Sequence, residues 1–309
     1  MSMAPRPPVR NPQLGFICIP PYRVQGTSVA GEESVVQVPE LDICFDIGRA
    51  PRTALASPFV ALSHGHMDHS AGLAYYFSQR TFQGMDPGTV LCPTACAEPI
   101  RNIMRAWVEL EGQRTPFNVI AMEPEQEFAI KNNIFLRAFQ TKHTAASLGF
   151  VVVEKRSKLR PDLQGLPQER IVELKRKGEQ ITEVHDIPLV CYTGDTCWGD
   201  HLLREDVLNA KVLITECTFL EPGHRDRAAV GKHLHLDDVV RLIRQSNADG
   251  IVLTHLSRRT HMAEARKQID AAIPDEFRDR VHLLMDGRAN RARYEKQLAA
   301  AEQAAAETA

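Results

Sequence analysis

The distribution of apolar residues along the chain predicts many short β-strands. Runs rich in Val, Ile and Leu recur between polar stretches, and several are bounded by Gly, Pro or Asp. Such runs are typical of strands that are half or fully buried in a sheet. The expected strands cover residues 34–38, 41–48, 59–64, 89–92, 118–122, 135–140, 149–155, 187–194, 211–216, 250–255 and 281–287.

Helices are expected where apolar residues recur at three- and four-residue spacing. The segments with this spacing are 71–80, 97–110, 236–246 and 263–273. The early strands follow one another closely enough to pair as a meander, whereas the later strands alternate with helices. This order predicts an α/β chain with two sheets and helices on their outer sides.

Both ends of the chain differ in composition from the middle. The first dozen residues carry four Pro and no apolar period, so 1–13 is predicted to be a mobile tail. The Ala- and Glu-rich end, 291–309, is expected to be a tail that is either a frayed helix or disordered. Residues 14–290 are then expected to form one main domain.

A charged segment at about 154–186 separates two strong strand patterns and is predicted to be an insertion. Between Lys155 and Lys177 it holds eight basic and three acidic residues, an excess of five positive charges. The whole chain has 37 Lys and Arg against 39 Asp and Glu. A nucleic-acid partner would therefore have to be held by a local basic patch, although a charge run is often only a solvated face.

Composition excludes several classes of protein. The chain has 309 residues, of which 43% are hydrophobic and 25% charged, so collagen-like, coiled-coil and disordered classes do not fit. No stretch is apolar enough to span a membrane, and the N-terminus lacks the apolar region of a signal peptide. The seven Cys form no C-x-x-C pair, which predicts buried free thiols in a reducing cytoplasm.

The segment SHGHMDHS, 63–70, places four potential metal ligands within six residues, directly after an expected strand. In an extended turn, alternate residues point the same way, so His64 and His66 can bind one ion. Asp68 and His69, at the start of the following helix, then face a neighbouring position. Imidazole and carboxylate are suitable zinc ligands, so this spacing predicts a metal site.

Three further candidate ligands stand just past the ends of apolar strands, where a rigid sheet can bring distant residues together. They are His143, Asp195 and His255. A carboxylate has two oxygens, so Asp195 is able to bridge two ions. The combined pattern predicts a dinuclear site.

These residues carry a resemblance to a known family. SHGHMDHS resembles the signature of metallo-β-lactamase-fold hydrolases, in which the remaining ligands follow in the order His, Asp, His. Within that superfamily the chain, from about 23 to 287, is most similar to short-form ribonuclease Z, the tRNA 3′-processing endonuclease. The supporting segments are FDIGRAP (45–51), TKHTAASLGF (141–150), YTGDT (192–196), TECTFLE (215–221), GKHLHLDD (231–238) and THLSRR (254–259).

The resemblance implies an αββα four-layer sandwich with a short basic exosite arm, and two Zn²⁺ ions per subunit. One ion would be bound by His64, His66 and His143, and the other by Asp68, His69 and His255, with Asp195 bridging. Mn²⁺ or Fe²⁺ would suit the same ligands.

The resemblance also implies a catalytic group. Asp68 would orient the attacking water, and Glu216 and His233 would form a pair near the leaving group. His235 is the less favoured alternative for the catalytic histidine. The chain departs from the family pattern at Thr215, where His is usual, and at Thr260, where an aromatic residue is usual.

The implied activity is zinc-dependent removal of the 3′ trailer from precursor tRNA, which leaves a tRNA 3′-hydroxyl and a 5′-phosphate on the trailer. The arm would grip the tRNA of a partner subunit, which implies a homodimer. Its expected RNA-binding residues are Lys155, Arg156, Lys158, Arg160, Lys175, Arg176 and Lys177. Two alternatives stay open: another hydrolase of this fold acting on a small phosphodiester, thioester or lactone, and a zinc-holding scaffold without turnover.

Overall fold

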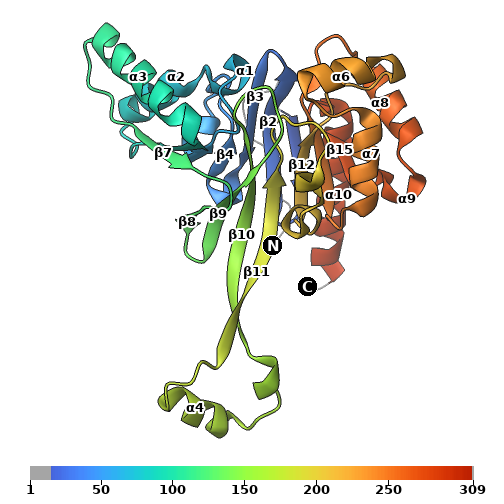
Figure 1. Ribbon diagram of the computed structural model, residues 1–309. Coiled ribbons are helices and arrows are strands. Elements are labelled where there is room, and N and C mark those ends of the chain that lie inside the picture. Colours follow the sequence, from blue (N-terminus) through green and yellow to red (C-terminus); the bar gives the residue numbers. More distant parts are fainter. Residues whose placement is uncertain (1–14, 308–309) are drawn as a thin grey trace.

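The computed structural model describes residues 15–307, and the predicted tail at 1–13 lies outside the described residues. Two β-sheets stand face to face, with helices packed on the outer side of each (Figure 1). The predicted four-layer α/β sandwich is thereby confirmed. Every strand and helix expected from the apolar pattern overlaps an observed one.

The first sheet comes mainly from the N-terminal part of the chain and is ordered β1-β2-β3-β4-β5-β6-β7, with β14 paired to β2. Pairs from β1 to β4 are antiparallel and pairs from β4 to β7 are parallel. Its strands are β1 (Gly15–Ile19), β2 (Tyr22–Ala30), β3 (Glu33–Val38), β4 (Ile43–Phe45), β5 (Phe59–Ala61), β6 (Thr89–Pro93), β7 (Asn118–Met122) and β14 (Leu256–Ser257). Strands β1 and β2 were not predicted, and in β2 the apolar pattern is interrupted because the polar residues Gln25 and Ser28 are buried beside the apolar ones.

The second sheet is ordered β15-β13-β12-β11-β10-β9-β8. Strands β8 to β11 pair antiparallel, and β11, β12, β13 and β15 pair parallel, as the strand–helix alternation in this half requires. Its strands are β8 (Glu127–Lys131), β9 (Ile134–Gln140), β10 (Leu148–Leu159), β11 (Thr182–Tyr192), β12 (Val212–Glu216), β13 (Gly250–Thr254) and β15 (Val281–Leu283).

Helices cover both outer faces of the sandwich. On the first sheet lie α1 (Met67–Ser70), α2 (Leu73–Phe82) and α3 (Thr94–Glu111). The second sheet is covered by α5 (Glu205–Leu208), α6 (Arg225–Gly231), α7 (Leu236–Gln245), α8 (Met262–Ala272) and α9 (Asp275–Arg278). The end of the chain forms α10 (Gly287–Glu307), so the expected tail is helical up to Glu307.

Three apolar cores hold the four layers together, because side chains alternate between the two faces of each strand. Val152 and Val190 point into the core between the sheets, whereas their neighbours Val151 and Cys191 point into the core under α7 and α8. A third core lies between the first sheet and helices α2 and α3. The core between the sheets aligns the loops at one end of the sandwich, where the candidate ligands lie.

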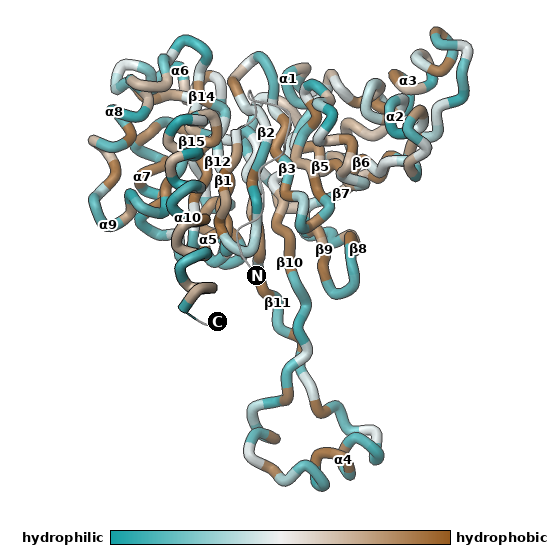
Figure 2. The backbone as a smooth tube through the Cα atoms, turned by 180° about the vertical axis from the view of Figure 1, so that it is seen from behind, coloured by the Kyte–Doolittle hydropathy of each residue, from teal (hydrophilic) through white to brown (hydrophobic). Residues whose placement is uncertain are grey.

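The predicted insertion is an arm made of β10, β11 and the segment between them, which contains α4 (Gln168–Arg176). The first six residues of β10 are buried in the body, and its last residues are exposed along the arm. Figure 2 shows this change as a passage from hydrophobic colour in the body to hydrophilic colour along the stem. The arm therefore projects from the end of the sandwich opposite the loops that follow β9 and β11.

Candidate metal centre

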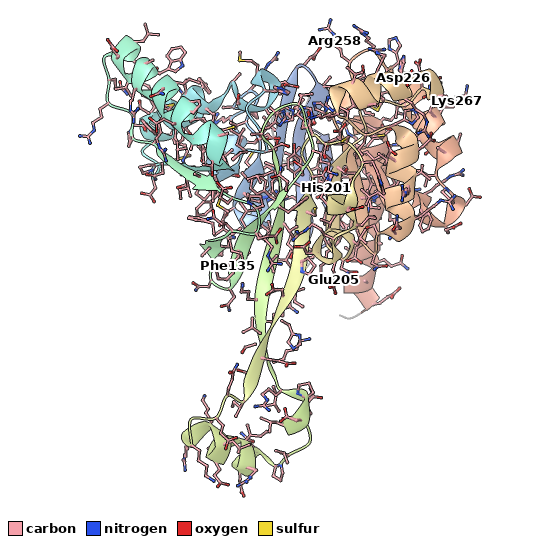
Figure 3. All side chains as sticks on the ribbon, viewed as in Figure 1. Phe135, His201, Glu205, Asp226, Arg258 and Lys267 are labelled. Carbon is pink, nitrogen blue, oxygen red and sulfur yellow. The ribbon has the colours of Figure 1, made fainter. Side chains whose placement is uncertain are left out.

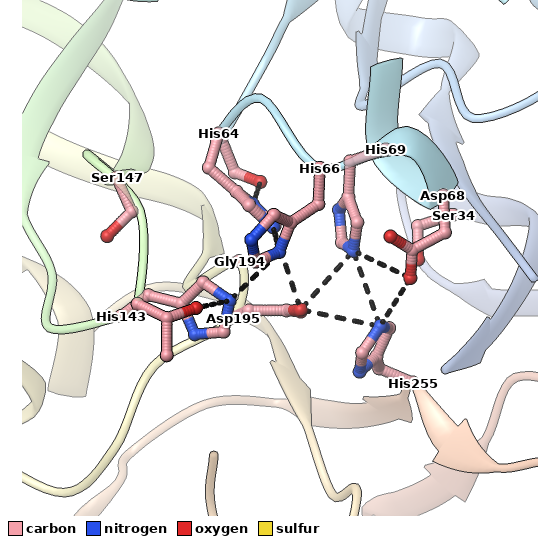
Figure 4. A network of polar contacts seen from close by, with 12 residues as sticks. Ser34, His64, His66, Asp68, His69, His143, Ser147, Gly194, Asp195 and His255 are labelled. Carbon is pink, nitrogen blue, oxygen red and sulfur yellow. Dashed lines mark hydrogen bonds and ion pairs between the residues drawn. The ribbon is translucent and has the colours of Figure 1, made fainter. Parts of the chain in front are cut away.

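The seven predicted ligands meet in one place between the sheets, although they come from four separate loops (Figure 4). The loops follow strands β5, β9, β11 and β13, which end at the same edge of the sandwich. The seven side chains are those of His64, His66, Asp68, His69, His143, Asp195 and His255. Sequence position alone had placed each of them just past a strand, and the packing of the two sheets brings them together.

A first group consists of His64, His66 and His143. Nδ1 of His66 lies 2.9 Å from Nε2 of His64 and 3.2 Å from Nε2 of His143. Ligand atoms around a tetrahedral zinc ion with bonds of ~2.0–2.1 Å stand about 3.3 Å apart. Both distances suit ligands of one ion, and all three nitrogens lie within 4.8 Å of one another.

A second group consists of Asp68, His69 and His255. Nε2 of His69 lies 3.3 Å from Nε2 of His255 and 3.6 Å from Oδ2 of Asp68. The distance between Nε2 of His255 and Oδ2 of Asp68 is 3.4 Å. The carboxylate of Asp68 is also held by the backbone N–H of Gly31, at 2.8 Å. This group has the same spacing as the first and adds a negative charge.

Asp195 lies between the two groups. Its Oδ2 atom is 3.9 Å from Nε2 of His64 and 3.3 Å from Nε2 of His69. Burial alone would raise the pKa of Asp195, but the charges of His255 and His69 hold it well below the ordinary value. Gly194, at a φ of +58°, makes the turn that presents this carboxylate, and a Cβ atom there would stand 2.7 Å from that of Ser63.

Hydrogen bonds to the other ring nitrogens fix which nitrogen of each histidine faces the centre. In four of the histidines Nδ1 has a partner in the surrounding protein, so Nε2 is the nitrogen that faces the centre. The pairs are His64 with Ser63 Oγ at 3.0 Å, His69 with Asp46 Oδ2 at 2.7 Å, His143 with the Lys232 carbonyl at 3.1 Å, and His255 with Thr218 Oγ1 at 3.0 Å. Such outer partners are characteristic of histidines that bind metal.

Burial keeps two of the histidines in the first group neutral. It lowers the pKa of His64 to about 2, with the charge of His69 as the second cause. The pKa of His143 is also lowered, again chiefly by burial. Neutral imidazole is the form that binds a metal ion, so this environment favours ligation over protonation. The donor set and its spacing fit two ions such as Zn²⁺.

Asp46 is a part of the centre to which the sequence assigned no role, although it lies in the FDIGRAP segment. It is fully buried and takes a positive φ of 56°. Its carboxylate accepts hydrogen bonds from the backbone N–H and hydroxyl of Ser63, from the hydroxyl of Tyr192 and from Nδ1 of His69. Only contacts between distant segments reveal this role, because an Asp directly after a strand ordinarily predicts a turn.

Glu216 and His233 form a pair beside the centre. Nδ1 of His233 lies 3.1 Å from both carboxylate oxygens of Glu216 and 3.9 Å from Oδ2 of Asp195. Burial alone would lower the pKa of His233, but the charge of Glu216 and its hydrogen bond raise it to about 9. The backbone N–H of Thr196 donates to the same carboxylate at 2.7 Å. His233 therefore has one fixed nitrogen and one available for chemistry.

His235, the alternative to His233, faces elsewhere. It is the N-cap of α7, where its Nδ1 accepts from the backbone N–H of Asp237 at 3.2 Å. Its Nε2 lies 2.9 Å from the carbonyl oxygen of Glu221, to which it donates. Both ring nitrogens of His235 are thus engaged by the fold, whereas His233 lies beside the ligand groups.

The predicted arm residues differ in whether their positive charges are paired with acidic side chains. Lys155 pairs with Glu127 and lies over the ring of Phe135, at the base of the arm. Figure 3 shows Phe135 in the body of the domain, well above the tip of the arm. Arg156, Arg160 and Lys177 form ion pairs with acidic neighbours. Within residues 15–307, the arm residues that form no ion pair are Lys158, Lys175 and Arg176.

Comparisons with known proteins agree with this fold and site. The family model described as Beta-lactamase superfamily domain matches residues 48–256. The tRNase Z TRZ1 of Arabidopsis thaliana is 33% identical over 270 residues, which cover 86% of this chain and 96% of the relative. A second protein of that plant, tRNase Z TRZ2, chloroplastic, is 31% identical over 252 residues, covering 80% of this chain and 71% of the relative.

Among solved structures, the short form of human tRNase Z has the same fold, with a TM-score of 0.55 and 18% identity. It covers 87% of this chain and 95% of the human one. The sandwich and its cluster of His and Asp define a hydrolase domain of the metallo-β-lactamase superfamily. Within that superfamily, the chain belongs to the tRNase Z family.

Proposed function

We propose that the protein is a zinc-dependent endoribonuclease that removes the 3′ trailer from precursor tRNA, leaving a 3′-hydroxyl on the tRNA and a 5′-phosphate on the trailer. The observation that carries the proposal is the Glu216–His233 pair beside the two ligand groups. Hydrolysis of a phosphodiester expels a poor leaving oxygen, which needs a proton donor close to the attacked phosphate. Ligands for metal ions alone do not provide that donor.

The proposed cofactors are two Zn²⁺ ions per subunit, one on each ligand group, with Asp195 shared between them. Such ions lower the pKa of water and neutralise charge on the attacked phosphate. The same nitrogen and oxygen ligands accept Mn²⁺ or Fe²⁺.

In this proposal the protein's own groups handle the protons and the geometry. Asp68 accepts a hydrogen bond from the attacking water and takes its proton, and the Gly31 N–H fixes the carboxylate for that task. His233 donates a proton through Nε2 to the departing 3′ oxygen. Glu216 accepts the Nδ1 proton of the same ring and thereby sets its tautomer and orientation.

The arm is proposed to bind the backbone of the tRNA. Lys158, Lys175 and Arg176 carry its free positive charge, and such side chains neutralise phosphates with little regard for sequence. Strand β10 has 12 residues. At ~3.3 Å per residue it reaches about 40 Å from the end that carries the site. The arm therefore holds these charges far from the site of its own subunit.

We propose a homodimer, in which the arm of one subunit serves the site of the other. Helix α3 presents Ile103, Trp107 and Leu110 on one exposed face, and neighbouring α2 exposes Tyr75 and Phe82. Clusters of exposed apolar side chains mark interaction surfaces. A second copy of the same face would cover them.

The proposed compartment is the cytoplasm. All seven cysteines are free, and Cys44, Cys191 and Cys217 are buried, as the sequence predicted. Free thiols are typical of proteins kept in a reducing compartment. Within residues 15–307, no helix is both long and apolar enough to cross a membrane.

A cleavage assay on precursor tRNA with a 3′ trailer tests the proposal. The chelated enzyme, and the same enzyme after Zn²⁺ is restored, are compared by mapping the ends of the products. We expect a single metal-dependent cut near the 3′ end of the acceptor stem, which also decides between cleavage before and after an encoded CCA. A protein that holds two metal ions and hydrolyses a small ester but leaves this RNA intact would be a small-substrate hydrolase instead.

A further inference from the structure

Thr218 stands between the proton-transfer pair and the metal ligands. Its hydroxyl oxygen lies 2.5 Å from Oε2 of Glu216 and 3.0 Å from Nδ1 of His255. The side chain is buried, so water does not compete for either contact. The mechanism proposed above uses Glu216 and His255 separately and assigns no role to the connection between them through this hydroxyl.

The number of protons decides the direction of both hydrogen bonds. A carboxylate only accepts, so the single hydroxyl proton of Thr218 is donated to Glu216. The same oxygen then accepts from His255, which means that Nδ1 of His255 carries the proton. Nε2 of His255 is left with the lone pair that a metal ion needs.

The same arrangement occurs once more in the centre, at the first ligand group. The hydroxyl of Ser63 donates to Oδ2 of Asp46 at 2.8 Å and lies 3.0 Å from Nδ1 of His64. In both cases a ligand histidine is joined to a buried carboxylate through one hydroxyl group. Two independent segments with this arrangement indicate that the hydroxyl is part of how the ligands are oriented.

The backbone of His255 is in an unfavourable conformation, so hydrogen bonds are needed to hold this residue in place. His255 takes a positive φ of 56°, a conformation that costs a non-glycine residue of order 1–3 kcal/mol. It is held there by a hydrogen bond from its N–H to the hydroxyl of Ser28, at 3.0 Å. The ring is held separately, by Thr218.

We propose that Thr218 is a positioning residue that fixes the tautomer of His255 and couples the second ligand group to the Glu216–His233 pair. This inference rests on the proposed metal centre. Two positions depend on the one hydroxyl: the ring of His255 on one side, and the carboxylate that orients His233 on the other. Its loss therefore weakens metal binding at the second group, and the first group keeps its own partners.

The test measures metal binding to the whole chain and needs no RNA. Apoprotein of the wild type, Thr218→Val and Thr218→Ser is titrated with Zn²⁺ against a competing chelator. Valine has nearly the shape of threonine without the hydroxyl, whereas serine retains it. Thr254→Val is the matched control, because the hydroxyl of this buried threonine donates only to the carbonyl of Thr215.

We expect Thr218→Val to bind one equivalent like the wild type and the other about 10- to 100-fold more weakly, the usual effect of losing an outer partner of a ligand. Thr218→Ser and Thr254→Val should bind both equivalents like the wild type. The proposal is overturned if Thr218→Val binds both equivalents normally, if both weaken alike, or if Thr218→Ser is as impaired as Thr218→Val. Where thermal melting shows that Thr218→Val does not fold, Thr218→Ala is judged against Thr218→Ser by the same criteria.

The readout separates this inference from the proposed function. A protein that shows the selective loss but leaves precursor tRNA uncut contradicts the proposed substrate and retains the role of Thr218. A protein that cuts the RNA without the selective loss contradicts only the role of Thr218.

Discussion

Nδ1 of His233 is equidistant, at 3.1 Å, from the two carboxylate oxygens of Glu216. Glu216 thus holds the imidazole of His233 through Nδ1, and the backbone N–H of Thr196 in turn holds the carboxylate of Glu216. Because His233 belongs to neither of the two proposed ligand groups, the proposed proton transfer and the proposed metal binding depend on different residues. Mutagenesis is therefore able to test each of them separately.

His233→Ala should lose turnover and keep its metal. Loss of a general acid costs about 10²- to 10⁴-fold in kcat. Metal content, measured by elemental analysis, should stay at the wild-type value because the ligands are untouched. A variant that lost metal in proportion to activity would show that His233 supports the ligands rather than the leaving group.

The matched control is His235→Asn, two residues away. Asparagine is a favoured N-cap residue, so α7 should be retained. We expect turnover within a few-fold of the wild type. A loss as large as that of His233→Ala would reassign the catalytic histidine.

Asp46→Asn should weaken both metal binding and folding. The amide places N–H groups where Ser63, Tyr192 and His69 now donate, so at least one buried donor loses its acceptor. A hydrogen bond to a charged group contributes about 1.5–3 kcal/mol, and we expect a loss of this size in the free energy of unfolding. Metal affinity should fall about 10- to 100-fold. Urea unfolding and zinc titration check this, and exposed Asp249→Asn should change neither.

Reversing the free charges of the arm should impair RNA binding without impairing chemistry. For Lys158→Glu/Lys175→Glu/Arg176→Glu we expect KM for precursor tRNA to rise at least about 10-fold, with kcat nearly unchanged. The slope of log affinity against log salt should fall by about 3. The rate of hydrolysis of bis(p-nitrophenyl) phosphate should be unchanged, because this small substrate does not contact the arm.

A control with the same change in net charge is Arg288→Glu/Arg291→Glu/Lys296→Glu, on α10. These three residues are exposed on α10. Their reversal should leave KM for tRNA close to the wild-type value. Equal effects of the two triple variants would mean that overall charge, and not the arm, attracts the RNA.

Ile103→Glu/Leu110→Glu should produce a monomer. Both side chains are exposed in the single chain, Leu110 by 74%, so the stability of the subunit should change little. Sedimentation velocity distinguishes the monomer from the dimer. Val184→Glu, a change at an exposed apolar residue of the arm, should leave the dimer intact. A double variant that sediments like the wild type would place the interface elsewhere.

Stability should fall between pH 7 and pH 5 partly because of His282. Burial, assisted by the charges of Arg293 and Arg266, lowers the pKa of His282 to about 3. The unfolded chain, with a histidine pKa near ~6.5, binds more protons in the interval between these values, so the free energy of unfolding decreases as pH falls. This group contributes about 2 kcal/mol of the decrease from pH 7 to pH 5. Between pH 7 and pH 5, the free energy of unfolding of His282→Gln, measured with urea, should decrease by about 2 kcal/mol less than that of the wild type. Equal decreases in the two proteins would contradict the role of His282.

The sequence was a good guide to the central strands such as β5, β12 and β13, whose apolar runs are nearly or fully buried. It was a poor guide to β2, where Gln25 and Ser28 are buried among apolar residues and paired with partners from other strands. The edge strand β8 was missed because its five residues are only partly buried and carry a weak apolar pattern. The sequence left the last segment open between a frayed helix and a disordered tail, and the structure has it helical up to Glu307, with Tyr294 packed against Phe16 near the start of the helix.

The sequence by itself determined which residues are able to bind metal and that they follow strands, because ligand type and strand pattern are local properties. It also indicated the Glu216–His233 pair through resemblance to a family. Tertiary structure decided the rest. Only the packing of the two sheets brings Asp46 into hydrogen-bond contact with His69, and Thr218 into contact with His255. Only the capping of α7 engages the ring of His235 away from the ligand groups. Hydrogen-bond partners far apart in the chain are set by the fold, and no local pattern encodes them.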